Sequence, residues 1–122
     1  MQFLTLAVAA LASLALVAGA PIEKRSQRGK ATYYYQNGQP GSCGGYAGDN
    51  DRVVAISSKF KSARKCGGKL KITNTSNGKS VTARIADTCP TCAKYDIDLS
   101  VGAFKALGSM SKGVLNVDWY NM

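Results

Sequence analysis

"KLKITNTSNGKSVTARIADTC", residues 69–89, decides the fold class of this chain. Apolar and polar residues alternate strictly in two runs, 69–74 and 80–86, and such alternation is typical of half-buried strands. Between the runs stands Asn77-Gly78, a dipeptide that strongly favours a tight hairpin turn. We therefore predict an antiparallel hairpin in which each strand buries one face.

Short strands and glycine-rich turns extend outward from this hairpin. Val101, Phe104 and Leu107 repeat at helical spacing and are followed by a glycine, which predicts a short helix with Ser100 as its N-cap. The other expected segments are strands at 31–35 and 114–120, an apolar run at 52–57, and loops at 36–51 and 87–95. Many short strands with one or two small helices indicate a mainly β fold, either a closed barrel or a sandwich.

The first 25 residues differ in composition from the rest. Residues 1–20 are almost wholly apolar, carry no charge and end in Ala18-Gly19-Ala20, the small-x-small pattern of signal-peptidase cleavage. A membrane anchor is the alternative for an apolar segment of this length. Residues 21–25 end in Lys24-Arg25, which resembles a kexin-type processing site unless the dibasic pair is fortuitous. We therefore expect a signal peptide at 1–20, a propeptide at 21–25 and one secreted domain at 26–122.

The charge of the chain is strongly positive, with a formal net charge of +9 and no histidine. Without histidine, Ser-His-Asp and Cys-His catalysis and the usual zinc ligand sets are excluded. The positive charge favours an anionic environment such as acidic polysaccharide, nucleic acid or a negatively charged cell wall. Lys59, Lys61, Arg64 and Lys65 lack interleaved aromatic residues other than Phe60, so we do not expect nucleic-acid binding.

Four cysteines are present, at 43, 66, 89 and 92. In a secreted domain of this size two disulfides are the default, and four cysteines allow three pairings. The Cys89–Cys92 spacing also matches a redox motif or half of a zinc site, but Cys43 and Cys66 do not form a second such pair. We expect Cys43–Cys66 and Cys89–Cys92 as disulfides, with the other pairings open, and neither a metal nor a cofactor.

Seven segments, in order along the chain, resemble one protein family. They are 29–35 (GKATYYY), 41–46 (GSCGGY), 53–57 (VVAIS), 65–72 (KCGGKLKI), 78–92 (GKSVTARIADTCPTC), 96–108 (DIDLSVGAFKALG) and 113–120 (GVLNVDWY). The chain resembles the double-psi β-barrel domain of expansins, barwin-like proteins and rare-lipoprotein-A-like proteins, above all their small single-domain fungal members such as the loosenin-like proteins. The resemblance implies a six-stranded double-psi β-barrel with a shallow polysaccharide groove, in a secreted fungal protein.

The resemblance also implies particular groove residues. The family's threonine near the first strand matches Thr32, and its two functional aspartates match Asp87 and Asp98. Bacterial expansins place a tyrosine two residues after the first aspartate, but that position is Cys89 here, so the contact is missing or is supplied by Tyr95 or another ring. Judged from the residues alone, Asp98 could instead cap the helix and Asp87 could instead satisfy turn amides.

The resemblance bears on hydrolysis as well. Glycoside hydrolysis by the usual route needs two carboxylates. In the distantly similar family-45 endoglucanases the acid lies in a place like Asp98, but the base position is Gln36 here, and glutamine cannot take a proton. Asp87 is a candidate substitute, while the histidine of the lytic-transglycosylase relatives is absent. We therefore expect a non-hydrolytic protein, with Asp98 as the candidate acid if hydrolysis does occur.

Aromatic rings complete the expected site. Along a strand, Tyr34 points to one side and Tyr33 and Tyr35 point to the other, so one side can pack the barrel while the other offers a ring to the flat face of a sugar. Tyr46, Tyr95 and Trp119 are further candidates, although Trp119 could equally belong to the core.

The function expected from these observations is binding of cell-wall polysaccharide (glucan, chitin or acidic polysaccharide) and its loosening without hydrolysis. We expect an extracellular monomer with no membrane association after signal removal. One alternative is a cysteine-protease inhibitor that uses the loops around Cys43 and Cys89–Cys92. A barwin-like defence or effector protein and a weak endoglucanase-like hydrolase are further alternatives.

Overall fold

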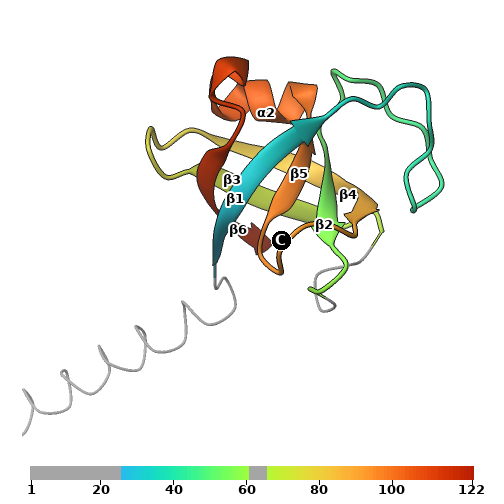
Figure 1. Ribbon diagram of the computed structural model, residues 1–122, viewed down its shortest axis with the longest axis horizontal. Helices are drawn as coiled ribbons and strands as arrows, with labels where there is room; N and C mark the ends of the chain where they lie inside the picture. Colours follow the sequence, from blue (N-terminus) through green and yellow to red (C-terminus); the bar gives the residue numbers. More distant parts are fainter. Residues whose placement is uncertain (1–25, 61–65) are drawn as a thin grey trace, which may run out of the picture.

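The computed structural model describes residues 26–60 and 66–122, which form a closed barrel with the strand order β1-β5-β2-β4-β3-β6 (Figure 1). The elements are β1 (Gln27–Tyr34), β2 (Val53–Ser57), β3 (Lys69–Asn74), β4 (Ser80–Cys89), β5 (Ile97–Ser100), α2 (Val101–Leu107), the 3-10 helix η2 (Met110–Lys112) and β6 (Leu115–Asn121). The predicted mainly β, six-stranded barrel is therefore confirmed. The predicted signal peptide and propeptide, and part of the basic segment 59–65, lie outside the described residues.

The central hairpin forms as the alternation predicts. Strands β3 and β4 pair antiparallel, with Leu70 opposite Ala83 and Ile72 opposite Val81, and all four side chains are buried. In the turn, the Asn74 N–H donates to the Lys79 carbonyl at 2.8 Å. Gly78 has a φ of 78°, in the left-handed region where glycine is favoured.

Parallel as well as antiparallel pairs close the barrel. β1 runs parallel to β5 and β2 runs parallel to β4, whereas the β1–β6, β2–β5, β3–β4 and β3–β6 pairs are antiparallel. The long segment 35–52 connects β1 to β2, which are not neighbours in the barrel because β5 lies between them. That segment projects from the barrel beside the end of β1 (Figure 1).

Helix α2 covers one end of the barrel (Figure 1) and buries Phe104 and Leu107 in the core. Its N-cap is Ser100, as predicted, whose hydroxyl accepts a hydrogen bond from the Ala103 N–H at 3.3 Å. Gly102 is required here, because a Cβ at this position would lie 2.6 Å from the Asn50 carbonyl oxygen. The helix therefore also fixes the end of the long loop.

Two expected boundaries were wrong, and strand pairing explains both of them. β1 begins at Gln27 because it pairs with β6 from that residue onward. β4 continues to Cys89 instead of ending in a loop at 87, because residues 87–89 pair with β2. The alternative role of Asp98 as a helix cap is wrong as well, because Asp98 lies within β5 and Ser100 is the N-cap.

Both predicted disulfides, Cys43–Cys66 and Cys89–Cys92, are present. The first ties the long loop to the segment before β3, and the second closes a tight loop at the end of β4. Within the described part of the chain, no helix is long and apolar enough to span a membrane.

Candidate functional site

One row of residues crosses four neighbouring strands on the outside of the barrel. Thr32 of β1 lies opposite Asp98 of β5, Asp98 lies opposite Ala55 of β2, and Ala55 lies opposite Asp87 of β4. The row thus places the threonine and both aspartates that the resemblance singled out on a single line. Ala55, which is buried, lies between the two aspartates in this row.

A register shift puts Asp87 into this row. Val54 pairs with Ile85, but the next residue, Ala55, pairs with Asp87 and not with Ala86. The extra residue turns Asp87 to the face that Asp98 occupies, as β-bulges commonly re-aim a side chain. Local sequence patterns do not reveal such a shift, which explains why residues 87–89 were expected to be a loop.

Asp87 also holds the long loop against the barrel. Its Oδ1 accepts hydrogen bonds from the Ser42 and Thr88 N–H groups, each at 2.8 Å. Gly41 packs so closely that a Cβ there would lie 2.2 Å from the Ala86 carbonyl oxygen. The alternative role given to Asp87, satisfying backbone amides, is therefore present in addition to its position in the row.

Asp98 has a perturbed acidity. Its Oδ1 accepts a hydrogen bond from the Thr32 hydroxyl at 2.9 Å. Burial raises the pKa of Asp98 above 3.8, since the charged form loses solvent, and this outweighs the hydrogen bond from Thr32, which lowers it. The negative charge of Asp87 adds to the rise.

The three consecutive tyrosines divide between two sides of β1. The Tyr33 ring packs edge-on against Phe104, with centroids 5.0 Å apart, so it belongs to the core side. Tyr34 points the other way, and burial raises its pKa, opposed by the neighbouring Gln36 amide and supported by the charges of Asp87 and Asp98. The shared electrostatics indicate that Tyr34 stands close to both carboxylates.

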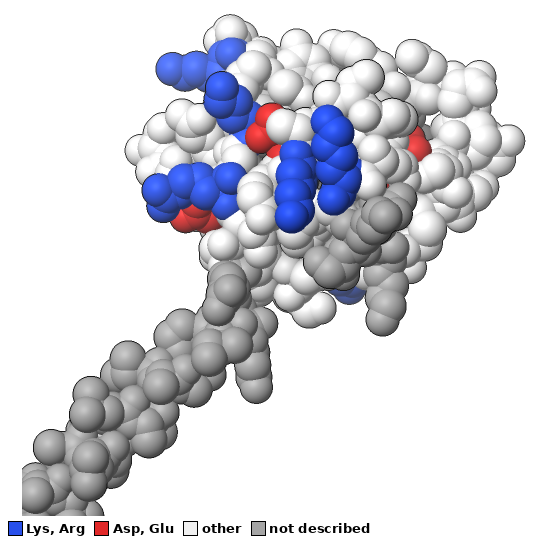
Figure 2. Space-filling model, turned by 60° about the horizontal axis from the view of Figure 1, so that its bottom comes forward, with Lys and Arg blue, Asp and Glu red and all other residues white. Residues whose placement is uncertain are grey.

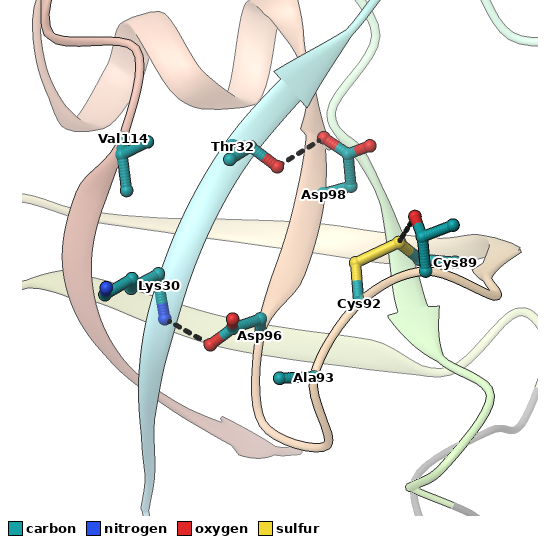
Figure 3. A pocket seen from close by; sticks show the side chains of 9 residues that line it. Lys30, Thr32, Cys89, Cys92, Ala93, Asp96, Asp98 and Val114 are labelled. Carbon is teal, nitrogen blue, oxygen red and sulfur yellow. Dashed lines mark hydrogen bonds between the residues drawn. A yellow bond between two sulfur atoms is a disulfide. The ribbon is translucent and has the colours of Figure 1, made fainter.

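An open cavity of about 270 Å³ adjoins the row. Thr32 and Asp98 lie in the middle of its lining, with the Cys89–Cys92 disulfide on one side and Val114 on the other (Figure 3). Asp96 lies below them and accepts a hydrogen bond from the Lys30 N–H at 2.9 Å. The cavity therefore combines carboxylates, a hydroxyl and an apolar disulfide surface, a mixture suited to a polar ligand with flat apolar patches.

None of the predicted aromatic residues lines this cavity. Tyr46 lies in the long loop and is 73% exposed. Tyr95 is 37% exposed and packs against Phe60, with centroids 5.5 Å apart. The prediction that Trp119 belongs to the site was wrong. Its side chain is only 1% exposed and its Nε1 donates to the Tyr95 carbonyl at 2.8 Å. Trp119 is therefore a core residue with no ring face exposed to a ligand.

Gln36 occupies a buried position beside the row. Its N–H donates to Asp49 at 2.7 Å, which anchors the start of the long loop. Its side-chain Nε2 is buried and has no hydrogen-bond partner among the described residues. The site lacks a carboxylate at this position, as the sequence indicated.

The prediction missed Lys30 and Val114, which also line the cavity. Lys30 was accessible to the sequence, because it shares its strand face with Thr32 and Tyr34 by simple alternation. Val114 could not have been predicted from the sequence, because it lies in the connection between η2 and β6, whose position depends on the whole fold. No group of three or more His, Cys, Asp or Glu residues in the described ranges could hold a metal ion.

Positive side chains gather on the face of the molecule shown in Figure 2, with few acidic side chains among them. An ion pair between Arg28 and Asp118, at 3.1 Å, neutralises one of the cations. Most of the remaining positive charge is therefore available to attract anionic material.

The sequence model of a protein family described as lytic transglycolase, a double-psi β-barrel family, matches residues 26–119. The chain belongs to this family. The match spans β1 to β5 and most of β6, and the resemblance to expansins and rare-lipoprotein-A-like proteins is confirmed with it.

Three relatives show how the family varies around this barrel. The papain inhibitor of Streptomyces mobaraensis is 31% identical to this chain, and the match covers 92% of this chain and 85% of the inhibitor. A solved structure of a Streptomyces papain inhibitor has a TM-score of 0.70 and 28% identity. That match covers 80% of this chain and 94% of the inhibitor chain. A mutant expansin of Clavibacter michiganensis, solved in complex with cellohexaose, is 28% identical with a TM-score of 0.69, over 80% of this chain and 50% of its own. Kiwellin of Actinidia chinensis is 33% identical over 67% of this chain and 46% of its own. This chain thus spans about half the length of the expansin and of kiwellin, but nearly all of the papain inhibitor.

Proposed function

We propose that this chain is a secreted protein that binds cell-wall polysaccharide across the row of Thr32, Tyr34, Asp98 and Asp87 and loosens it without hydrolysis. The observation that carries the proposal is the register that aligns Thr32, Asp98 and Asp87 across four strands beside an open cavity. The likeness to an expansin solved with cellohexaose supports a sugar chain as the ligand.

The chemistry of the row suits a polyhydroxylated chain. Asp98 and Asp87 accept hydrogen bonds from sugar hydroxyls, and such charge-assisted bonds are stronger than neutral ones. The Tyr34 ring offers an apolar face for stacking against a sugar ring, and its hydroxyl can donate a hydrogen bond. A chain held in this way exchanges contacts with neighbouring chains for contacts with the protein, and this exchange is the proposed loosening.

Two features argue for binding without cleavage. The position that holds a base in related endoglucanases is the buried amide of Gln36, which cannot accept a proton in that role. Asp87, the remaining candidate base, has its Oδ1 committed to two backbone N–H groups. Two strand spacings separate Asp87 from Asp98, which puts their Cα atoms about 10 Å apart. This distance alone does not exclude hydrolysis by the two carboxylates. Released sugar is therefore the measurement that separates the two activities.

The test is a pull-down of residues 26–122 with cellulose, chitin and pectin-rich wall material, combined with an assay of released reducing sugar. We expect binding without released sugar, weakened by Asp98→Asn and unchanged by Tyr120→Phe, a control on β6 away from the row. Released sugar that disappears in Asp98→Asn would establish a hydrolase instead. Absence of binding to all three materials would overturn the proposal.

A second candidate function is inhibition of a papain-like cysteine protease. The papain inhibitor matches this chain over nearly its whole length, and the long loop presents Tyr35 and Tyr46, which are 54% and 73% exposed. If this function holds, the protein lowers papain activity in a titration and Tyr46→Ala relieves the inhibition. Full papain activity at a large excess of the protein would exclude it.

A further inference from the structure

A second cavity lies beside the candidate groove, between the β3–β4 turn, residues 108–112 and the start of β6. Its volume is about 420 Å³, larger than the 270 Å³ of the first cavity. Its lining includes Ser76, Lys112 and Asn116, and it carries amide, hydroxyl and ammonium groups but no carboxylate. Its chemistry therefore differs from that of the Asp98 cavity.

The two cavities adjoin each other. Val114 lines both of them and is 49% exposed. Lys30, which lines the first cavity, lies directly opposite Asn116, which lines the second, in the β1–β6 pair. Figure 3 shows Val114 across β1 from Asp98, with Lys30 on the strand between. A ligand that crosses β1 from Asp98 therefore arrives at the second cavity.

The floor of the second cavity is rigid. The Nδ2 atoms of Asn74 and Asn77 both donate to the Leu107 carbonyl at 3.0 Å, and Asn74 is only 3% exposed. The Asn74 Oδ1 in turn accepts from the Ser76 N–H at 2.9 Å. The Asn77 Oδ1 accepts from the Lys79 N–H at 2.9 Å, so each asparagine amide donates one hydrogen bond and accepts another, and together they tie the turn to the end of α2.

The polar side chains of this cavity that have no partner indicate which kind of ligand it can bind. The Ser76 hydroxyl, the Asn116 amide and the Lys112 ammonium have no hydrogen-bond or ion-pair partner in the portion of the chain that the structure describes. Together they offer donors and acceptors of the kind that sugar hydroxyls use, on a floor that needs no ordering when a ligand binds.

We propose that the second cavity is a distal subsite, in which Ser76, Asn116 and Lys112 hold the next units of the polysaccharide chain bound at Asp98. This inference rests on the proposed function and extends it. From β5 across β1 to β6 the path covers two strand spacings, about 10 Å, before the second cavity begins. A long oligosaccharide therefore occupies both cavities, whereas a disaccharide fills only one.

Calorimetric titration of residues 26–122 with cellobiose and cellohexaose tests the subsite. We expect the protein to bind cellohexaose at least about 10-fold more tightly than cellobiose, and the double variant Lys112→Ala, Asn116→Ala to lose most of that preference. Lys105→Ala removes an exposed lysine on α2 that lines neither cavity and serves as the matched control. Asp98→Asn, measured in parallel, reports on the groove itself.

The outcomes separate the two proposals. If Asp98→Asn weakens cellohexaose binding but the double variant equals the control, the distal subsite is wrong and the groove stands. If the unaltered protein binds none of cellohexaose, chitohexaose and hexagalacturonate, both proposals fail. A single variant, Asn116→Ser, distinguishes loss of the amide from loss of the fold, because it keeps a polar side chain at an exposed position.

Discussion

At the scale of single residues, the half-buried carboxyl group of Asp98 links stability to pH. Its pKa in the folded state is raised above 3.8, so the folded protein binds more protons than the unfolded chain between 3.8 and the raised value. The stabilising contribution is thus present below 3.8 and falls as pH rises through the folded pKa. We expect Asp98→Asn to remove this fall and to be at least as stable as the unaltered protein near neutral pH. Denaturant unfolding at about pH 3 and about pH 7 measures the difference.

The same pKa can be measured directly by NMR titration of the side-chain carboxyl carbon. Thr32→Val keeps the shape of the side chain but removes the hydroxyl that donates to Asp98, and this hydrogen bond lowers the pKa. We therefore expect the pKa of Asp98 to rise further in Thr32→Val. A value at or below 3.8 in the unaltered protein would contradict the account of this site.

Tyr34 allows the ring and the hydroxyl to be tested separately. Tyr34→Ala removes the stacking face and should weaken hexasaccharide binding about 10-fold or more, whereas Tyr34→Phe keeps the ring and should cost only about 2- to 5-fold. Tyr120→Ala, on β6 opposite Lys71 and away from the row, is the matched control. Equal losses for Tyr34→Phe and Tyr34→Ala would show that the hydroxyl and not the ring makes the contact.

At the scale of elements, the end of β4 joins the long loop to the barrel through one carboxylate. Asp87→Ala removes the acceptor of the exposed Ser42 N–H, so we expect a loss of about 0.5–1.5 kcal/mol in unfolding free energy and faster hydrogen exchange at Ser42 and Cys43. Asp87→Asn keeps an acceptor oxygen and should retain most of the protection. Unchanged exchange in Asp87→Ala would mean that the Cys43–Cys66 disulfide alone fixes the loop.

How far the sequence predicted these elements depends on where the information lies. The β3–β4 hairpin was predictable because alternation and an Asn-Gly turn are local signals. The extension of β4 was not, because it depends on a register shift against β2, far away in the sequence. Asp98 was expected near the start of a helix. In the structure β5 runs directly into α2, and Asp98 lies within β5 as part of the sheet.

The candidate site was predictable in the same uneven way. Thr32, Asp87 and Asp98 came from the resemblance, and only the register of four strands shows that they share one row. Trp119 was misplaced although a signal existed: Leu115, Val117 and Trp119 alternate along one face of β6, and all three are buried. The second cavity gave no signal, since its lining comes from three separate turns and strands.

At the scale of the whole molecule, the net charge should act on wall binding independently of the groove. The formal charge is +9, and positive side chains gather on one face (Figure 2). Raising the ionic strength from about 0.15 M to about 1 M shortens the screening length from about 8 to about 3 Å. We expect retention on pectin-rich material to fall several-fold, with cellohexaose binding changed little. Unchanged retention on pectin-rich material at about 1 M would mean that the net charge does not contribute to wall binding.

The most direct test of the central claim is an NMR titration of residues 26–122 with cellohexaose, followed through the backbone amides. The account predicts that the largest shifts fall on Thr32, Ala55, Asp87 and Asp98, which lie on adjacent strands but far apart in the sequence, and that the hexasaccharide stays intact. Shifts centred on Tyr46 and the long loop, or cleavage of the hexasaccharide during the titration, would contradict it.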